Sequence, residues 1–426
     1  MADKVKGRVA WAFYDWANSA FPTVITTFVF ATYFTKGVAL DPITGTAQWG
    51  WALSISALAV ALLGPVMGAV ADHTGRRKPW LAFFTYACVA ASALLWFVKP
   101  DPSWVLFALV VMGVANFCFE MAVVFYNAML PGLVDKSHLG RLSGWAWGLG
   151  YIGGLGCLTV ALVGFVQSDT PWFGLSREEA QYLRATPVLV ALWMGFFALP
   201  IFFFTPDTKT VAVPLGQAVR AGVASLRTTL GHVRRYKSIA RYLLARMIYT
   251  DGLNTLYAFG GIYAGVTFGM DFAEIITFGI AINVVSGVGA FGFAWVDDWI
   301  GPKKTVLIAL AGVSVLGLAL VLAQSKTQFW LFAMPLGLFV GPAQAASRSF
   351  MAHLAPKDMV SEMFGLYALS GKATAFVAPL VLAWATLAFD SQRAGMATIL
   401  VFFALGAYLL WSLPDPTRPT ETVQKN

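Results

Sequence analysis

Charged residues are scarce in this chain. Asp, Glu, Lys and Arg make up 12% of the 426 residues, whereas 58% of the residues are hydrophobic. Soluble globular domains carry about 25% charged residues, so this chain has too little charge to cover a surface that faces water. The composition therefore excludes an ordinary soluble protein and predicts an integral membrane protein with many spans.

Cysteines and the signatures of common enzymes are scarce too. Cys88, Cys118 and Cys157 all lie inside apolar runs, where we expect small core residues and neither a disulfide nor a metal site. The sequence has no HExxH pattern, no cysteine pair, no Gly-x-Ser-x-Gly context and no nucleotide-binding G-x-x-x-x-G-K-S/T loop. We therefore expect no enzymatic activity, no metal, no cofactor and no ATP-driven pumping.

Long apolar runs make up most of what is present. A membrane-spanning helix needs about 20 mostly apolar residues, and we predict twelve such spans. They run over about residues 9–36, 47–71, 80–98, 104–130, 142–167, 185–205, 241–266, 272–296, 304–324, 328–350, 361–388 and 393–413. The predicted fold class is all-α and integral to the membrane, with twelve transmembrane helices in two six-helix halves. A linker, 206–240, separates the N-terminal half, 1–205, from the C-terminal half, 241–426.

The basic residues are distributed unevenly over the predicted loops. Of the 29 lysines and arginines, 20 lie on the side of the N-terminus and 6 on the other side, and the rest lie within or at the edge of spans. Loops rich in Lys and Arg stay in the cytoplasm, so we expect both termini and the linker to be cytoplasmic. Because the basic residues alternate with apolar runs, the net charge of +8 does not indicate nucleic-acid binding.

The linker has the pattern of an amphipathic helix. Apolar residues recur at helical spacing, and arginines follow every seventh residue on another face: Leu215, Val219, Val223, Leu226, Leu230 and Val233, with Arg220, Arg227 and Arg234. Such a helix would lie on the cytoplasmic leaflet with its basic side toward anionic headgroups. A solvated linker helix without a lipid role fits the pattern equally well.

One polar pattern occurs once in each predicted half. Asp15 and Asn18 in the first span have counterparts in Asp251 and Asn254 in the seventh. The three-residue spacing puts both side chains of each pair on one face of a helix. Paired halves with a substrate site between them near mid-membrane are typical of secondary transporters.

The segment Gly68–Arg77, GAVADHTGRR, resembles the loop motif G-x-x-x-D-x-x-G-R-R/K of the major facilitator superfamily and lies, as there, between spans two and three. A looser copy, with Ala294 in place of the first glycine, follows span eight. The resemblance implies two pseudo-symmetric halves with spans 1, 4, 7 and 10 around a cavity. It also implies a gate formed by Gly68, Asp72, Gly75, Arg76, Arg77 and Asp298. Asp72 would lie near a helix N-terminus of the other half, and Arg76 would meet a carboxylate near the end of span four, with Asp135 as the candidate.

Longer stretches narrow this resemblance. They are FYDWANSAF at 13–21, FYNAMLP at 125–131, GYIGG at 150–154, GPAQAASRS at 341–349 and FGLYALSGK at 364–372. Together they are similar to the branch that includes the yeast autophagy-related vacuolar amino-acid effluxer and its bacterial relatives. The resemblance covers essentially the whole chain and implies a monomeric solute transporter in a bacterial inner membrane.

Six charged residues lie inside the predicted spans, where a charge costs about 2.5–3.5 kcal/mol on insertion scales. They are Asp15, Glu120, Asp251, Arg246, Arg348 and Lys372. They either form ion pairs that fasten helices or serve substrate binding and proton transfer, because a buried carboxylate without a full partner can take up a proton at neutral pH. Asp15 and Asn18 are too close to the cytoplasmic end for a midplane site, so we expect them to hold span one and line the cytoplasmic mouth.

The candidate substrate or coupling residues are Glu120, Tyr126, Asn127, Arg246, Tyr249, Asp251, Asn254, Gln344, Arg348 and Lys372. We expect a secondary transporter for a small polar solute, with an amino acid or a related zwitterion as one candidate. A proton gradient would drive it, with Glu120 or Asp251 as the carrier. The alternative is a flippase for lipids or amphiphiles, or a non-transporting receptor on the same fold, whereas a channel or a membrane enzyme has little support.

Overall fold

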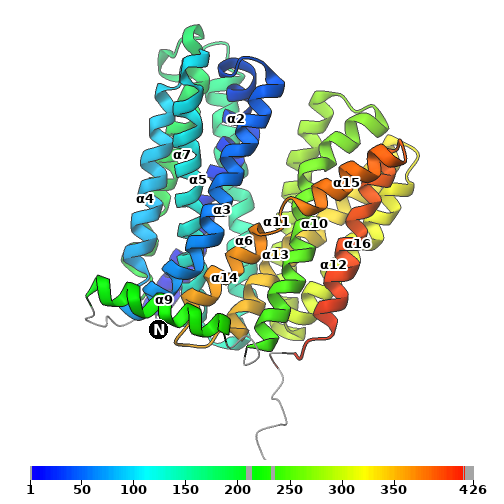
Figure 1. Ribbon diagram of the computed structural model, residues 1–426. Helices are drawn as coiled ribbons and strands as arrows, with labels where there is room; N and C mark the ends of the chain where they lie inside the picture. Colours follow the sequence, from blue (N-terminus) through cyan, green and yellow to red (C-terminus); the bar gives the residue numbers. More distant parts are fainter. Residues whose placement is uncertain (1, 208–213, 232–235, 416, 418–426) are drawn as a thin grey trace, which may run out of the picture.

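The computed structural model describes the chain except residues 1, 208–213, 232–235, 416 and 418–426, and over that part its regular elements are helices (Figure 1). The first half contains α1 (Ala2–Asn18), a π-helical segment (Phe21–Phe28), α2 (Phe30–Tyr33), a second π-helical segment (Phe34–Val38), α3 (Pro42–Thr74), α4 (Lys78–Leu94), α5 (Val105–Met129), α6 (Leu139–Ala161), α7 (Gln181–Phe197) and α8 (Leu199–Phe204). After α9 (Leu215–Gly231) come α10 (Lys237–Phe268), α11 (Phe272–Ile300), α12 (Pro302–Leu322), α13 (Lys326–Leu354), α14 (Val360–Lys372), α15 (Val377–Ala388) and α16 (Gln392–Trp411).

The twelve predicted spans correspond to helices. Ten of the helical stretches in the described chain are long and apolar enough to cross a bilayer. The other two spans are the first, which runs from α1 to Val38 and contains π-helical segments, and the seventh, α10, which has 32 residues. These two are the helices that carry the Asp-x-x-Asn pattern. The predicted fold of twelve helices in two halves is confirmed, while the boundaries drawn around the linker stay a prediction.

Not every predicted span is one continuous α-helix. The fifth ends in a π-helical segment (Leu162–Val166), and the sixth divides at Ala198 into α7 and α8. After Asn18 the first span continues as a π-helix that has Pro22 in its first turn. The eleventh span, predicted as one helix over 361–388, divides at residues 373–376 into α14 and α15. The prediction is wrong in this respect because Pro379 lies in the first turn of α15. There its missing N–H needs no helical partner.

The two halves meet at one end of the bundle, the lower end in Figure 1. We call the interface between the two halves at this end the seam. Its contacts join α3 to α14, and α6 to α11 and α13. Small residues let the backbones approach: a Cβ atom at Gly68 would collide with the Ser361 carbonyl, and one at Gly144 would lie 2.6 Å from the Cβ of Ala294. Ala294 stands where the loop motif has its first glycine. Gly144 on the facing helix has no side chain, so it leaves room for the methyl group of Ala294. We call this end, which carries the N-terminus and α9, the basic end.

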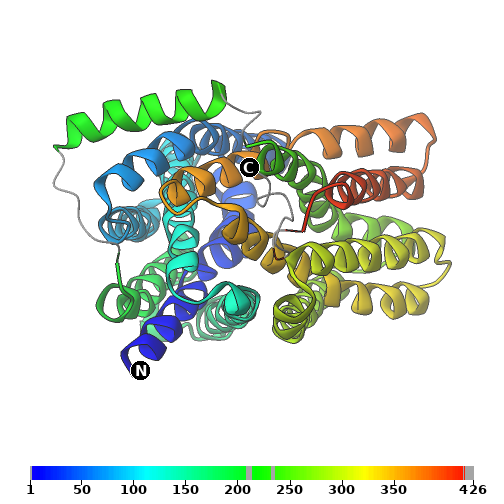
Figure 2. The same cartoon turned by 90° about the horizontal axis from the view of Figure 1, so that it is seen from below.

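α9 runs crosswise to the spans along the basic end (Figure 1) and lies at the perimeter of the bundle (Figure 2). It packs on α3. The helix predicted in the linker is thus present, although Val233 and Arg234 of the predicted pattern lie outside the described residues.

Candidate functional site

The first layer of polar contacts across the seam is at Asp72, near the end of α3, which Gly75 terminates with a left-handed φ of 71°. The Oδ1 atom of Asp72 accepts a hydrogen bond from the Ser361 N–H at 3.0 Å, and its Oδ2 atom accepts one from the Glu362 N–H at 2.8 Å. These amides belong to the first turn of α14, where free N–H groups and the helix dipole favour a carboxylate. Asp72 thus makes the contact that the resemblance implies, while its role as a gate stays a prediction.

The arginine that completes this layer is Arg77. Its Nε donates to the Ser361 Oγ at 2.9 Å, and its Nη2 lies 3.3 Å from the Asp72 Oδ1. Arg76 is exposed, and within the described residues it forms no ion pair with Asp135 or with another carboxylate. The pairing expected for Arg76 is therefore wrong in this structure, because the chain turns back after α3 and brings Arg77 over Asp72.

Asp298 repeats the contact on the other side of the seam. Its Oδ1 accepts a hydrogen bond from the N–H of Arg141 at 3.0 Å, in the first turn of α6, and its Oδ2 lies 3.2 Å from the Arg141 Nε. Beside it, Asp297 accepts a hydrogen bond from the Ser349 Oγ at 2.6 Å. The sequence repeat therefore holds in space, since each carboxylate caps the start of a helix in the other half.

Deeper in the bundle, the buried Arg348 of α13 joins three helices of the first half. Its Nη1 lies 3.0 Å from the Asp15 Oδ2 and 3.3 Å from the Asn127 Oδ1, while its Nε and Nη2 donate to the Oγ and carbonyl of Ser143 at 2.9 and 2.7 Å. Asn18 donates to Asp15 at 3.4 Å. The Asp15 and Arg348 side chains are only 12% and 4% exposed, so removing one of them would strand a buried charge. We call Asp15, Asn127, Ser143 and Arg348 the arginine lock.

Aromatic rings surround the arginine lock. The Arg348 guanidinium lies 5.0 Å from the centroid of the Trp11 ring and 5.5 Å from that of Tyr126, within cation–π range. Tyr126 also stacks on Trp11, with ring centroids 4.4 Å apart. Tyr126, a predicted substrate residue, therefore packs around the lock in this structure.

A second ion pair inside the membrane also crosses the seam. The Nζ of Lys372, at the end of α14, lies 2.7 Å from the Oε1 of Glu120 on α5. The Glu120 and Lys372 side chains are 19% and 29% exposed, so this pair is less buried than the arginine lock. Because its side chains are more exposed, the Glu120–Lys372 pair is more accessible to a solute or a proton than the Asp15–Arg348 pair.

Asp251 has no basic partner among the described residues. Its Oδ2 accepts a hydrogen bond from the N–H of Ala378 at 3.0 Å, and its Oδ1 is buried without a partner. Ala378 belongs to the first turn of α15, so Asp251 caps the second piece of the interrupted span. Asp251 thus gives a hydrogen-bond acceptor to a backbone N–H that the break in span eleven leaves without a helical partner.

Arg246 and Tyr249, both predicted as substrate or coupling residues, fasten helices within the second half. The Nη1 of Arg246 donates to the Tyr367 carbonyl at 2.6 Å and to the Ser370 Oγ at 2.7 Å, and the guanidinium lies 3.4 Å from the centroid of the Tyr367 ring. The hydroxyl of Tyr249 lies 2.6 Å from the Ser347 Oγ. Arg246 thus contacts a carbonyl, a hydroxyl and an aromatic ring, and among the described residues no carboxylate forms an ion pair with it.

A cavity of about 740 Å³ lies beyond the lock and extends into the second half. Its wall is formed by the first span, α6, α10, α11, α12, α13 and α16. Of the ten predicted substrate or coupling residues, only Asn254 and Gln344 line it, and no Asp, Glu, Lys, Arg or His is among its described lining residues. The cavity is therefore neutral, and the charged residues on which the prediction concentrated lie outside its wall.

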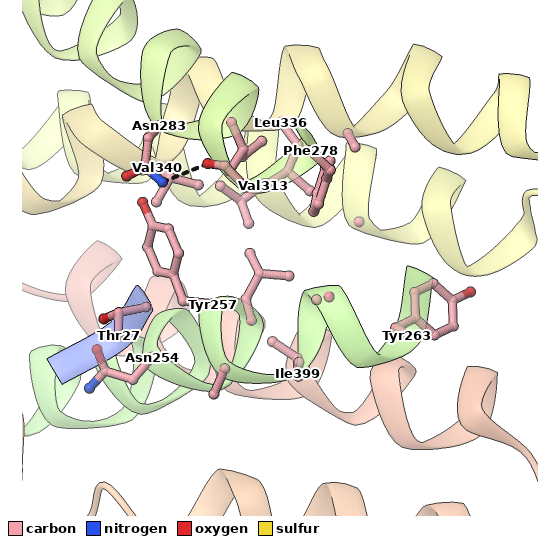
Figure 3. A pocket seen from close by; sticks show the side chains of 18 of the residues that line it. Thr27, Asn254, Tyr257, Tyr263, Phe278, Asn283, Val313, Leu336, Val340 and Ile399 are labelled. Atoms are coloured by element: carbon pink, nitrogen blue, oxygen red, sulfur yellow. Dashed lines mark hydrogen bonds between the residues drawn. The ribbon is translucent and has the colours of Figure 1, made fainter. Parts of the chain in front are cut away.

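The polar groups of the cavity wall are few and neutral. Figure 3 shows Asn254 and Tyr257 on α10 and Asn283 on α11. The Tyr257 hydroxyl lies 3.0 Å from that of Tyr151 across the seam, and the Asn283 Nδ2 donates to the Gly279 carbonyl at 2.7 Å. Tyr257 and Asn283 are not among the predicted site residues, although Tyr257 follows the predicted Asn254 by three residues on one face of α10.

The polar layers separate this cavity from the basic end. Along α6, Gly140 packs against Asp297 and Ser143 binds Arg348 before Trp147 reaches the cavity wall. Seven residues from Gly140 to Trp147 correspond to roughly 10 Å of helix. The seam is therefore closed over about two helical turns between the basic end and the cavity.

Comparison with known proteins gives a consistent set of relatives. The family described as "Vacuole effluxer Atg22 like" matches residues 43–418. A Bacillus subtilis protein, described as the uncharacterized MFS-type transporter YxiO, is 27% identical over 430 residues, which cover 99% of this chain and 98% of that protein. Autophagy-related protein 22-1 of Phaeosphaeria nodorum is 22% identical over 435 residues, which cover 86% of this chain and 75% of that protein.

Solved structures of the major facilitator superfamily share the fold. The proton:xylose symporter XylE bound to 6-bromo-6-deoxy-D-glucose gives a TM-score of 0.75 at 13% identity, over 97% of this chain and 96% of that chain. FucP in its outward conformation gives a TM-score of 0.73 at 14% identity, over 95% of this chain and 97% of that chain. Identities this low establish the fold and leave the solute open.

Proposed function

The chain belongs to the family of Atg22-like vacuole effluxers, and we propose that it carries a solute across the membrane by alternating access. A relative that aligns with 99% of this chain is described as an MFS-type transporter, and a protein of the same fold is a proton:xylose symporter. The observation that carries the proposal is the order of features along the seam, in which two polar layers close the basic end and the cavity begins beyond them. The contacts of Asp72, Asp298 and Arg348 each join the two halves, so a rigid-body rotation breaks them together.

The direction of this closure follows from the loop charges. Because loops rich in Lys and Arg stay inside the cell, we place the basic end and both termini in the cytoplasm, and the chain in a bacterial inner membrane. The state described here is then closed toward the cytoplasm. Its cavity belongs to the outward-facing part of the cycle.

The cavity chemistry supports a solute with a largely apolar surface and a few hydrogen-bonding groups. Aliphatic and aromatic side chains dominate the wall, and Asn254, Asn283 and Gln344 offer neutral amides. A charged solute would lose water there without gaining a counter-ion, which costs free energy. A volume of about 740 Å³ is in the range of sites for drug-sized ligands, so an uncharged amphiphile is our first candidate.

The small polar zwitterion expected from the sequence is the second candidate. The observation in its favour is the ion pair between Glu120 and Lys372, whose partly exposed charges offer a counter-ion for each end of a zwitterion. Ligands that bind the folded state raise its melting temperature, so a thermal screen with neutral amphiphiles and with amino acids separates the candidates. Asn254→Ala should weaken the response to amphiphiles, whereas Lys372→Met should weaken the response to amino acids.

A reversible cross-link at the basic end tests the alternating-access mechanism. Arg141→Cys and Asp298→Cys replace side chains that lie 3.2 Å apart across the seam. Oxidation should trap the closed state and stop proteoliposome uptake of the solute found in the screen, and a reductant should restore uptake. Each single-cysteine variant is the control for oxidation itself. Full uptake with the halves cross-linked would exclude the mechanism.

We also propose a proton gradient as the driving force, with Glu120 or Asp251 as the carrier. Protonation of Glu120 would break its pair with Lys372 across the seam, and Asp251 has one carboxylate oxygen without a partner. Glu120→Gln and Asp251→Asn are the matched tests. The variant that removes the carrier should lose accumulation against a gradient and keep solute exchange. Accumulation by both variants would place the carrier elsewhere.

A further inference from the structure

α9 is attached to both halves at the closed seam. On α3, Gly222 packs so closely that a Cβ atom there would lie 2.9 Å from the Val70 nitrogen. On α14, the Glu362 Oε2 accepts a hydrogen bond from the Ser225 Oγ at 3.0 Å. The N–H of the same Glu362 binds Asp72, so α9 is one hydrogen bond away from the first polar layer. Separation of α3 from α14 must break at least one of these attachments.

The opposite face of α9 is not covered by the described part of the protein. Val219 and Val223 are 41% and 48% exposed, and Arg220 and Arg227 are exposed with them, whereas Ala218 on the packed face is buried. Figures 1 and 2 place this helix crosswise to the spans, at the level of their ends and on the perimeter of the bundle. In a membrane this is the headgroup region, where valines can enter the acyl boundary and arginines can meet lipid phosphates.

We propose that the exposed face of α9 binds anionic phospholipid headgroups, and that this binding stabilises the closed basic end. Lipid contacts keep α9 in the plane of the leaflet, where Gly222 reaches α3 and Ser225 reaches α14. Only the closed state presents both packing partners to the helix at once, so a lipid that favours this position of α9 shifts the equilibrium toward closure. The proposal concerns the basic end alone and is independent of the solute and of the driving force.

Spin-label distances in nanodiscs test the coupling. Arg76→Cys and Lys357→Cys introduce labels at exposed sites next to α3 and α14, after the three buried cysteines are replaced by alanine. Exchanging half of the phosphatidylcholine for phosphatidylglycerol should raise the closed-to-open ratio about fivefold, equivalent to about 1 kcal/mol. Identical distance distributions in the two lipid mixtures would overturn the proposal.

Charge variants identify the surface responsible. Arg220→Gln combined with Arg227→Gln should abolish the lipid response, whereas Arg241→Gln, which removes an exposed charge from α10, should preserve it. Ser225→Ala should reduce the response because it removes the attachment to α14. A response that survives in the double variant and falls in Arg241→Gln would assign lipid sensing to another surface.

A fluorescent probe tests lipid contact separately from the seam. Val223→Cys carrying bimane should be quenched by brominated phospholipids, and Ser137→Cys, on an exposed loop of the same end, should not. Quenching at position 223 together with a lipid-dependent distance supports the proposal. A bimane at position 223 that resists brominated lipids would make α9 a solvated linker and overturn it.

Discussion

The two copies of the Asp-x-x-Asn pattern have different partners. Asp15 crosses the seam and lies 3.0 Å from Arg348. Asp251 stays within its own half, caps α15 through one oxygen and leaves the other without a partner, while Asn254 lines the cavity. The same four-residue pattern therefore closes the seam in one half and supports an interrupted helix in the other. A repeat determines where a side chain lies along its helix, and the helix packed against it determines its role.

Removal of the base from the arginine lock should give the largest effect. Arg348→Met leaves Asp15 buried without a cation, and stranding one charge of a buried pair costs about 3–5 kcal/mol. The melting temperature in detergent should fall clearly. Adding Asp15→Asn should recover part of the loss, because neither charge is then stranded. A double variant that is no more stable than Arg348→Met would show that the pair does not hold the seam.

Asp15→Asn should affect the exchange between states more than binding. The amide keeps an acceptor for Arg348 and loses the charge that closes the seam, at a cost of about 1–3 kcal/mol. Solute affinity should remain within about 10-fold, or about 1.4 kcal/mol, of the parent, while the rate of exchange between states changes. Titration calorimetry and counterflow measure the two. A larger loss of affinity with normal exchange would make Asp15 a substrate ligand.

Asp251→Ala should act locally and more weakly. A lost helix cap costs about 1 kcal/mol, and here the helix concerned is α15. Hydrogen–deuterium exchange should therefore rise in residues 377–388 and stay unchanged in α3 and α6. Faster exchange at the basic end would mean that Asp251, too, contributes to the closure.

Asp72 and Asp298, the two carboxylates that cap helices across the seam, should respond alike and least. Asp72→Asn and Asp298→Asn each keep an acceptor and lose the interaction of a charge with a helix dipole, about 0.3–1 kcal/mol. Each variant should modestly increase maleimide labelling of Gln344→Cys from the basic end in inside-out vesicles. If only one of the two variants changes labelling, the two sides of the seam do not open together.

Composition and hydropathy predict the fold well because lipid imposes a length and a polarity on every span. The twelve spans and the linker helix are accordingly found where apolar or amphipathic periodicity indicates them. The interruption of span eleven was harder to predict, although Pro379 is visible in the sequence. Whether a proline kinks a helix or starts one depends on a cap, and that cap comes from Asp251, 127 residues away.

The site was less accessible to sequence reasoning than the fold. Asp15 and Arg348 are 333 residues apart, and periodicity within each helix does not reveal which faces meet across the seam. The prediction also followed charge, whereas the cavity wall is neutral and its polar members are amides and hydroxyls such as those of Asn283 and Tyr257. The buried ion pair of Asp15 and Arg348 lies at the closed seam, whereas the cavity becomes evident only when the helices are packed together.

Distance measurements across the basic end in matched Asp15→Asn and Asp251→Asn proteins test whether Asp15, and not Asp251, holds the seam closed. Spin labels at Ser137→Cys and Lys304→Cys lie at exposed positions of the two halves. We expect Asp15→Asn to shift the distribution toward longer distances, because it weakens a contact across the seam. We expect Asp251→Asn to reproduce the parent distribution. A basic end that opens in Asp251→Asn and stays closed in Asp15→Asn would contradict this assignment.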